Sequence, residues 1–89
     1  MDNLNLWISI DGAKYSCKYG EHMKCAIDIC ERYYTGRYED TNMNPVEFLL
    51  DKGYIQISNS LAMISIYRNP SLVQKEFLLE NEIKLEYIP

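Results

Sequence analysis

The residues with the greatest capacity for chemistry lie in one stretch, SCKYGEHMKCAIDIC, which runs from Ser16 to Cys30. It holds all three cysteines and the single histidine, so a metal site or a Cys/His catalytic pair must be considered. On a helix with about 100° per residue, Cys25 and Cys30 diverge by about 140°, so one ion cannot bind both. His22 and Cys25 could share a ligand sphere with Cys17, but the turn-borne C-x(2–4)-C knuckles of structural zinc sites are missing. We therefore expect no metal ion and a structural role for this stretch.

The sequence contains no recognisable catalytic motif. A nucleophilic cysteine needs a lowered thiol pKa, an imidazole within hydrogen-bond reach and an oxyanion hole, and the sequence establishes none of these. Gly-rich phosphate loops, Ser-nucleophile elbows and nucleotide fingerprints are also missing. The carboxylate pair Glu39-Asp40 is most simply part of a solvated loop. The sequence thus predicts a protein that is not an enzyme and uses no cofactor.

Composition and charge narrow the class of protein further. The 89 residues suffice for one domain, 1–89, and 47% hydrophobic with 25% charged residues is typical of a folded globular chain. The net charge of −4 disfavours nucleic acid as a partner. No apolar run approaches the roughly 18 residues of a membrane span, and the N-terminus lacks the pattern of a signal peptide. We expect a cytoplasmic protein without a membrane partner, whose odd number of cysteines stays reduced.

The elements that position these residues begin with a β-hairpin. Apolar residues alternate over 4–10, and Asp11-Gly12 follows, which is the strongest short-range signal for a tight turn. A two-residue turn there pairs Ile8 with Tyr15 on an apolar face. It places Trp7 on the opposite face, where the ring is either exposed or covered by a helix.

Three helices and a second hairpin complete the expected fold. The apolar period predicts a helix over 21–33, Asn44-Pro45 begins a second that ends at Gly53, and a third spans 68–81. The third is capped by Asn69-Pro70 or by a Ser71-x-x-Gln74 capping box. Two strands around Asn59-Ser60 predict a second hairpin, and residues 83–87 a last strand.

The expected fold class is α+β, in which two antiparallel β-hairpins form a sheet with about three helices packed mainly on one face. The predicted core residues are Ile8, Ile10, Tyr15, Ile29, Leu49, Leu50, Ile55, Ile57, Ile64 and Phe77.

Aromatic residues point to a partner-binding surface. The chain holds eight tyrosines and one tryptophan, and such amphipathic rings are enriched in protein interfaces. A polar loop over 36–43 adds charged neighbours to these rings. The predicted partner-binding residues are Trp7, Tyr34, Arg37, Tyr38, Glu39 and Asp40.

The skeleton WISIDG, GEHMKCAIDI, NPVEFLLDKGYIQIS and NPSLVQKEFL resembles a pattern of small uncharacterised proteins from bacteriophages and mobile elements. Where that pattern has Trp after the glycine of its third segment, this chain has Tyr54. The resemblance implies an accessory protein that binds a host protein, including defence or CRISPR components. The matching positions are Trp7, Asp11, Gly12, His22, Leu49, Gly53, Tyr54 and Gln74.

Two functions are compatible with these observations. The first is a non-enzymatic binding protein that modulates or inhibits a host or other cellular protein; the resemblance implies a phage-encoded inhibitor of a host defence or CRISPR component. The alternative is a nucleic-acid-associated regulator, built on a winged-helix-like unit of the second helix and second hairpin. That regulator needs a local basic patch despite the negative net charge. The residues available for it are Lys14, Lys18, Lys24, Arg32 and Arg37.

Overall fold

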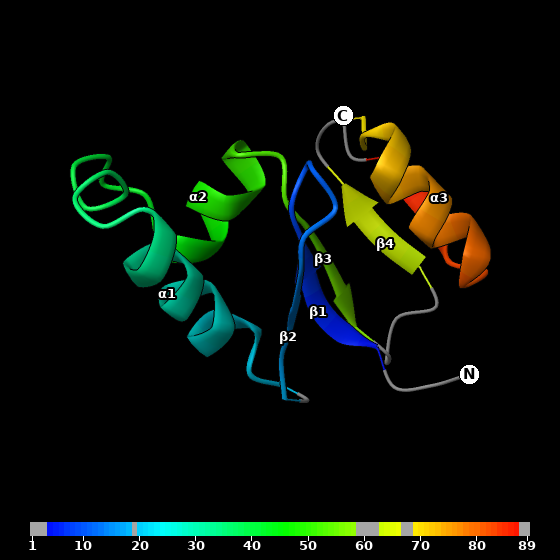
Figure 1. The fold of residues 1–89 in the computed structure, drawn as a ribbon, viewed down its shortest axis with the longest axis horizontal. Coiled ribbons are helices and arrows are strands. Elements are labelled where there is room, and N and C mark those ends of the chain that lie inside the picture. Colours follow the sequence, from blue (N-terminus) through cyan, green and yellow to red (C-terminus); the bar gives the residue numbers. More distant parts are fainter. Residues whose placement is uncertain (1–3, 19, 59–62, 67–68, 88–89) are drawn as a thin grey trace.

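The fold, given by a computed structural model, is α+β with three helices among the described residues, which confirms the predicted class (Figure 1). The structure describes residues 4–18, 20–58, 63–66 and 69–87. The elements in chain order are β1 (Asn5–Ile8), β2 (Lys14–Ser16), α1 (His22–Tyr33), α2 (Pro45–Asp51), β3 (Ile55–Ser58), β4 (Met63–Ile66), α3 (Leu72–Glu80) and β5 (Lys84–Tyr87).

The strands pair differently from the two predicted hairpins. β1 is the central strand of a three-stranded antiparallel sheet in the order β2-β1-β3, while β4 and β5 pair in parallel. β3 lies against β1 with Leu6 opposite Ile57 and Ile8 opposite Ile55. This pairing joins the apolar residues of both strands into one row, which explains why β3 pairs with β1. The predicted turn at Asn59-Ser60 lies outside the described residues.

The first hairpin forms, but with a longer turn than predicted. The Ser9 N–H donates to the Ala13 carbonyl at 2.8 Å, and the Gly12 N–H donates to the Ser9 carbonyl at 3.0 Å. These bonds enclose a three-residue loop that ends at Gly12, whose φ of 92° is in the left-handed region. Trp7 consequently pairs with Tyr15, one residue away from the predicted register. A one-residue slip changes the face of every side chain, so Tyr15 shares the face of Trp7.

The sheet is buried on both faces. Its first core cluster, on the α3 face, contains Leu6, Ile8, Ile55, Ile57 and Leu78. Its second core cluster, on the face of α1 and α2, contains Trp7, Ala26, Ile29, Cys30, Phe48, Leu49 and Tyr54. Two of the three helices therefore share one face, while α3 covers the other (Figure 1).

Most of the predicted core residues are buried or half-buried. Ile10 is the exception, with 51% of its surface exposed, because the longer turn removes it from the strand. The side chain of Ile64 lies outside the described residues. The buried members of the prediction are Ile8, Ile29, Leu49, Ile55 and Ile57, and the half-buried members are Tyr15, Leu50 and Phe77.

The predicted caps of the last two helices are confirmed. The Asn44 side chain accepts a hydrogen bond from the Glu47 N–H at 2.8 Å, which begins α2. α3 uses the capping box of Ser71 and Gln74, so it begins later than the predicted range. Within the described ranges, no helix combines the length and apolar character needed to cross a bilayer.

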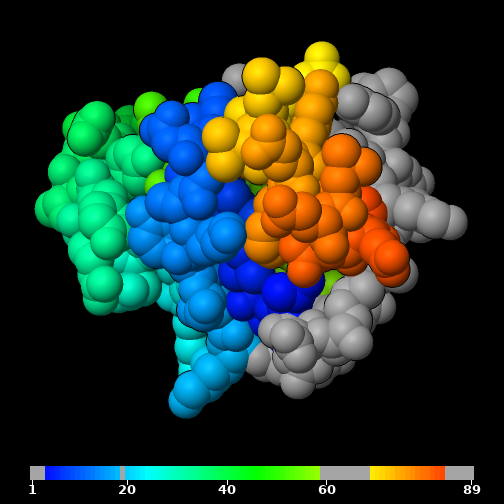
Figure 2. All heavy atoms as spheres, turned by 45° about the vertical axis from the view of Figure 1, so that its right-hand side comes forward, coloured from blue at the N-terminus to red at the C-terminus, as the bar shows by residue number. Residues whose placement is uncertain are grey.

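α3 lies beside the β1–β2 turn (Figure 2), and this contact makes Gly12 sensitive to substitution. A Cβ at Gly12 would lie 2.5 Å from Val73 Cγ1, and the left-handed φ adds backbone strain. We expect Gly12→Ala to lower the free energy of unfolding by about 1–2 kcal/mol or more. Gly20→Ala is the matched control, because Gly20 has a φ of 78° but open space around it.

Denaturant unfolding of both variants separates the two contributions, since only Gly12→Ala combines strain with a clash. Adding Val73→Ala to Gly12→Ala should remove the clash, so the loss in the free energy of unfolding should become similar to that of Gly20→Ala. Equal decreases in the free energy of unfolding for Gly12→Ala and Gly20→Ala would show that α3 moves to accommodate the added methyl group without an energetic penalty.

Candidate functional site

The candidate site is the loop that connects α1 to α2, which projects at the end of the molecule opposite α3 (Figure 1). Successive turns shape this loop: the Arg37 N–H donates to the Tyr34 carbonyl at 2.9 Å, and the Thr41 N–H donates to the Tyr38 carbonyl at 3.2 Å. The Thr41 hydroxyl donates to the same Tyr38 carbonyl at 2.6 Å. The loop backbone is therefore held by internal bonds rather than extended in solvent.

The Phe48 ring of α2 packs against the two tyrosines of the loop. Tyr34 and Tyr38 pack edge-on against Phe48, with centroid distances of 5.2 Å and 5.9 Å. The Tyr34 hydroxyl lies 3.2 Å from the Tyr54 hydroxyl, which links the loop to the sheet. Burial, followed by the hydrogen bond with Tyr34, raises the pKa of Tyr54 well above its usual value, so this phenol stays protonated. Rings of this kind form a stable base for the exposed residues above them.

Five of the six predicted partner-binding residues meet at this loop. Arg37, Glu39 and Asp40 are exposed, while Tyr34 and Tyr38 are half-buried. The Arg37 guanidinium lies over the Tyr34 ring, 5.5 Å from its centroid, in cation–π geometry. We call this set, Tyr34, Arg37, Tyr38, Glu39 and Asp40, the loop surface.

Trp7 does not belong to the loop surface, and its assignment as a partner-binding anchor is wrong. Its side chain is completely buried in the second core cluster, under α1 and α2. The indole Nε1–H donates to the His22 carbonyl at 3.1 Å, which satisfies its one polar group. Of the two possibilities that the sequence left open for this sheet face, exposed or covered by a helix, the structure shows the second, which makes Trp7 a core residue.

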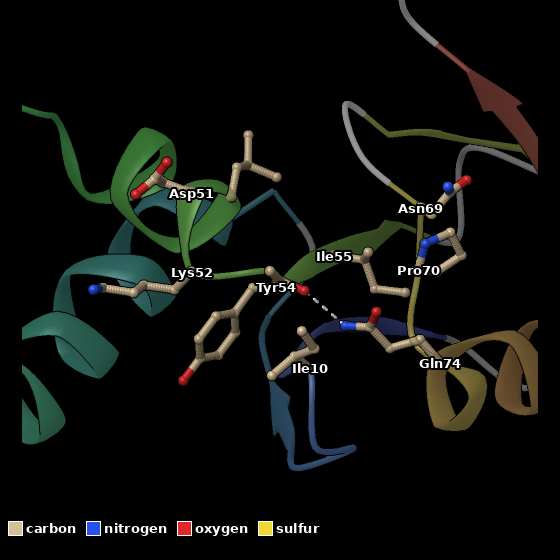
Figure 3. Close-up of a pocket in the computed structure, with 10 residues that line it drawn as sticks. Ile10, Asp51, Lys52, Tyr54, Ile55, Asn69, Pro70 and Gln74 are labelled. Carbon is tan, nitrogen blue, oxygen red and sulfur yellow. Dashed lines mark hydrogen bonds between the residues drawn. The ribbon is translucent and has the colours of Figure 1, made fainter.

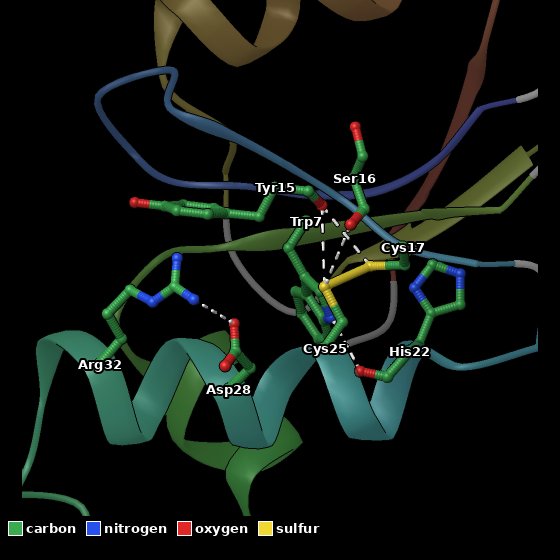
Figure 4. The surroundings of a disulfide bond; sticks show 8 residues. All are labelled: Trp7, Tyr15, Ser16, Cys17, His22, Cys25, Asp28 and Arg32. Atoms are coloured by element: carbon green, nitrogen blue, oxygen red, sulfur yellow. Dashed lines mark hydrogen bonds and ion pairs between the residues drawn. A yellow bond between two sulfur atoms is a disulfide. The ribbon is translucent and has the colours of Figure 1, made fainter.

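The cysteines differ from the prediction of three reduced thiols. Cys17, just beyond β2, and Cys25, on α1, form a disulfide, and only Cys30 is a free cysteine among the described residues (Figure 4). Cys30 is buried in the second core cluster, and burial raises the pKa of its thiol, with a smaller contribution from Glu31. A thiol in such a position is a packing group with little nucleophilic character.

His22 is unusual because neither ring nitrogen contacts solvent or has a hydrogen-bond partner in the described structure. Its ring lies edge-on to Trp7, with centroids 6.3 Å apart. Burial lowers the pKa of the imidazole below its ordinary value, so the ring is neutral at pH 7. In the part of the chain that the structure describes, no group of three or more His, Cys, Asp or Glu side chains is placed to hold a metal ion.

A feature that sequence reasoning undervalued is the side chain of Gln74, which lines a cavity of about 140 Å³ (Figure 3). Only 1% of its surface is exposed, and its amide nitrogen lies 3.1, 2.9 and 2.9 Å from the carbonyl oxygens of Ile8, Ser9 and Gly53. One residue thus ties α3 to β1 and to the end of α2. The capping-box spacing identified Gln74, but only the fold shows these long-range bonds.

The winged-helix-like unit of the alternative function is not formed as predicted. β3, which follows α2, pairs with β1, and β4 pairs with β5. The positive charges of two of the five basic residues are also neutralised by ion pairs. Lys24 pairs with Glu21 and Arg32 pairs with Asp28, each at 3.4 Å. These ion pairs reduce the local positive field that a nucleic-acid surface requires.

Comparison with known proteins identifies no relatives: no family model, curated protein or solved structure matches this chain. The resemblance to phage and mobile-element proteins therefore stays a prediction.

Proposed function

We propose that this chain is a non-enzymatic binding protein that modulates or inhibits a protein partner through the loop surface. The observation that carries the proposal is the combination of two ring anchors, Tyr34 and Tyr38, with three exposed charged side chains beside them. Binding hot spots commonly consist of aromatic and Arg side chains in an ordered setting. The loop surface has this composition.

Order in the free protein supports the proposal. Phe48 holds both tyrosine rings, and hydrogen-bonded turns hold the backbone, so little further conformational entropy is lost on binding. Such preorganisation lowers one of the main costs of association. A surface built in this way can bind well despite its small area.

The charges of the loop surface favour a protein partner. The loop surface carries one guanidinium and two carboxylates, Glu39 and Asp40, so its summed charge has the same sign as the net charge of −4. A complementary partner would present basic side chains and an apolar patch that accepts the rings. Within this proposal the partner is an intracellular host protein, such as the defence or CRISPR component that the phage resemblance implies.

The test is affinity capture from a host lysate, followed by calorimetry with the purified partner. We expect Arg37→Ala with Tyr38→Ala to weaken binding by at least about 30-fold, since a single hot-spot truncation costs about 2 kcal/mol or more. The matched control is Lys75→Ala with Leu79→Ala on α3, where both side chains are exposed and far from the loop. The control should bind like the unaltered protein.

Parallel binding measurements with DNA and RNA at low and moderate salt examine the alternative function. Micromolar affinity for nucleic acid that falls steeply with salt, together with no captured protein, would favour the regulator. A captured partner whose affinity is unchanged by the loop substitutions would contradict the loop surface while leaving the binding class intact.

A further inference from the structure

Two sulfur atoms and one imidazole meet at the start of α1. The Cα atoms of Cys17 and Cys25 are 5.8 Å apart, and their sulfurs are joined in a disulfide. His22 precedes Cys25 by three residues on the same helix, and such residues have Cβ atoms about 5–6 Å apart. The three residues are therefore neighbours at the start of α1 (Figure 4).

The imidazole of His22 lacks a partner that its chemistry requires. A neutral imidazole has one N–H donor and one acceptor nitrogen, and buried polar atoms nearly always form hydrogen bonds. Neither nitrogen of His22 has a partner in the described structure, although both are out of contact with solvent. A buried and unsatisfied pair of nitrogens calls for a specific explanation, such as a ligand bound in another state.

The backbone around the three side chains is held independently of the disulfide. The Trp7 indole donates to the His22 carbonyl, and Ala26 and Ile29 anchor the following turn of α1 in the second core cluster. Breaking the disulfide would therefore leave Cys25 and His22 on a helix that stays packed. The freed Cys17, next to the end of β2, would stay nearby for the same reason.

We propose that reduction of the Cys17–Cys25 disulfide opens a binding site for one thiophilic metal ion, Zn²⁺ being the best fit, with Cys17, Cys25 and His22 as ligands. A dithiol or phosphine reductant supplies two electrons and is itself oxidised. The S–S bond breaks, and two protons from solvent complete the two thiols. On binding, each thiol releases its proton to solvent and the imidazole donates a nitrogen lone pair, so that a water completes four-coordination.

The oxidised and reduced proteins differ in their available ligands. In the disulfide, both sulfurs are bonded to each other, so the oxidised protein has no thiolate to offer at this place. The proposed site lies at the first turn of α1, whereas the loop surface follows its last turn, and the 12-residue helix separates them by about 18 Å. The metal site is thus independent of the proposed partner binding.

The test compares metal binding by the oxidised and the reduced protein. Protein reduced with a phosphine, and then freed of it without oxygen, is titrated with Co²⁺ and next with competing Zn²⁺. We expect one ion per chain and the absorption of a thiolate-to-cobalt charge transfer, with binding at least about 100-fold weaker in the oxidised protein. The spectrum distinguishes thiolate ligands from adventitious carboxylates.

Substitutions identify the ligands. Cys17→Ser and Cys25→Ser should each abolish the charge-transfer band or reduce it strongly, and His22→Gln should weaken binding by about 10- to 100-fold or more. Cys30→Ser is the matched control, because Cys30 takes no part in the disulfide and its thiol faces the Pro45 carbonyl of α2 at 3.8 Å, so its replacement should not affect binding. Far-UV circular dichroism of each reduced variant reports whether it is folded.

Three results would overturn the proposal. These are equal affinity in the oxidised and reduced proteins, unaltered affinity in His22→Gln, and a charge-transfer band that disappears in Cys30→Ser. If the reduced protein loses structure without metal, Zn²⁺ should restore it, and failure of Zn²⁺ to do so would also count against the site.

Discussion

Replacing Trp7 with alanine is expected to lower the free energy of unfolding by about 3–5 kcal/mol, which is a large part of the stability of a small domain. Trp7 is the largest of the fully buried side chains and lies at the centre of the second core cluster. Its removal leaves a cavity under α1 and α2 and deprives the His22 carbonyl of the indole donor. At about 4–8 °C per kcal/mol, the Tm should fall by more than about 10 °C.

Thermal and denaturant unfolding of the oxidised protein measure this effect, so that the disulfide is the same in every sample. Trp7→Phe is the graded control, because it keeps a ring in the core but removes the Nε1–H donor, and it should cost clearly less than alanine. Leu79→Ala is a surface control, since Leu79 is 77% exposed. A Trp7→Ala protein with unchanged stability would show that the ring is not the core residue described here.

Replacing Gln74 is the second change with a large expected effect. Gln74→Leu should lower the free energy of unfolding by about 3 kcal/mol, because several backbone groups buried by α3 lose a partner at once. The Gln74 amide nitrogen serves three carbonyl oxygens, and its Oε1 accepts from the Ser71 N–H at 2.9 Å. Ser9 keeps a second donor in the Gly12 N–H, which limits the loss.

Two related variants make this prediction specific. Ser71→Ala removes only the cap and should cost about 1 kcal/mol. Gln74→Glu keeps the shape of the side chain but directs a carboxylate at three carbonyl oxygens. Of the three variants Gln74→Leu, Ser71→Ala and Gln74→Glu, it should therefore have the lowest free energy of unfolding near pH 7. Below the ordinary carboxyl pKa of about 4.3, protonation restores one O–H donor, and part of the stability should return.

Denaturant unfolding at pH 7 and pH 4 gives the order of stability. Lys75→Ala, at the next residue of α3 but exposed, should remain within about 0.5 kcal/mol of the unaltered protein. Equal stability of Ser71→Ala and Gln74→Leu would show that Gln74 acts only as a cap.

The sequence by itself determined the elements whose signals are local. The period of apolar residues and the capping residues Asn44 and Ser71 placed the helices, because both depend on residues within a few positions of one another. The tyrosines and charged residues of the loop surface were predicted together for the same reason, since they are close along the chain. Burial of Ile8, Ile55 and Ile57 follows from strand alternation.

The tertiary structure decided what depends on contacts between distant residues. A one-residue difference in the turn that ends at Gly12 moved Tyr15 to the other face of the sheet, and no local propensity separates the two registers. β3 could pair with either β4 or β1, and the row formed with Leu6 and Ile8 favoured β1. The position of α1 and α2 over the sheet then buried Trp7.

The same contacts decided the chemistry at the start of α1. Cys17, just beyond β2, and Cys25, on the first turn of α1, lie eight residues apart in sequence, and they meet because both pack against the second core cluster. Gln74 contacts Ile8 and Gly53, which are far away along the chain, because α3 lies across the end of β1. Side-chain partners of this kind follow from packing, which the linear pattern of residue types does not specify.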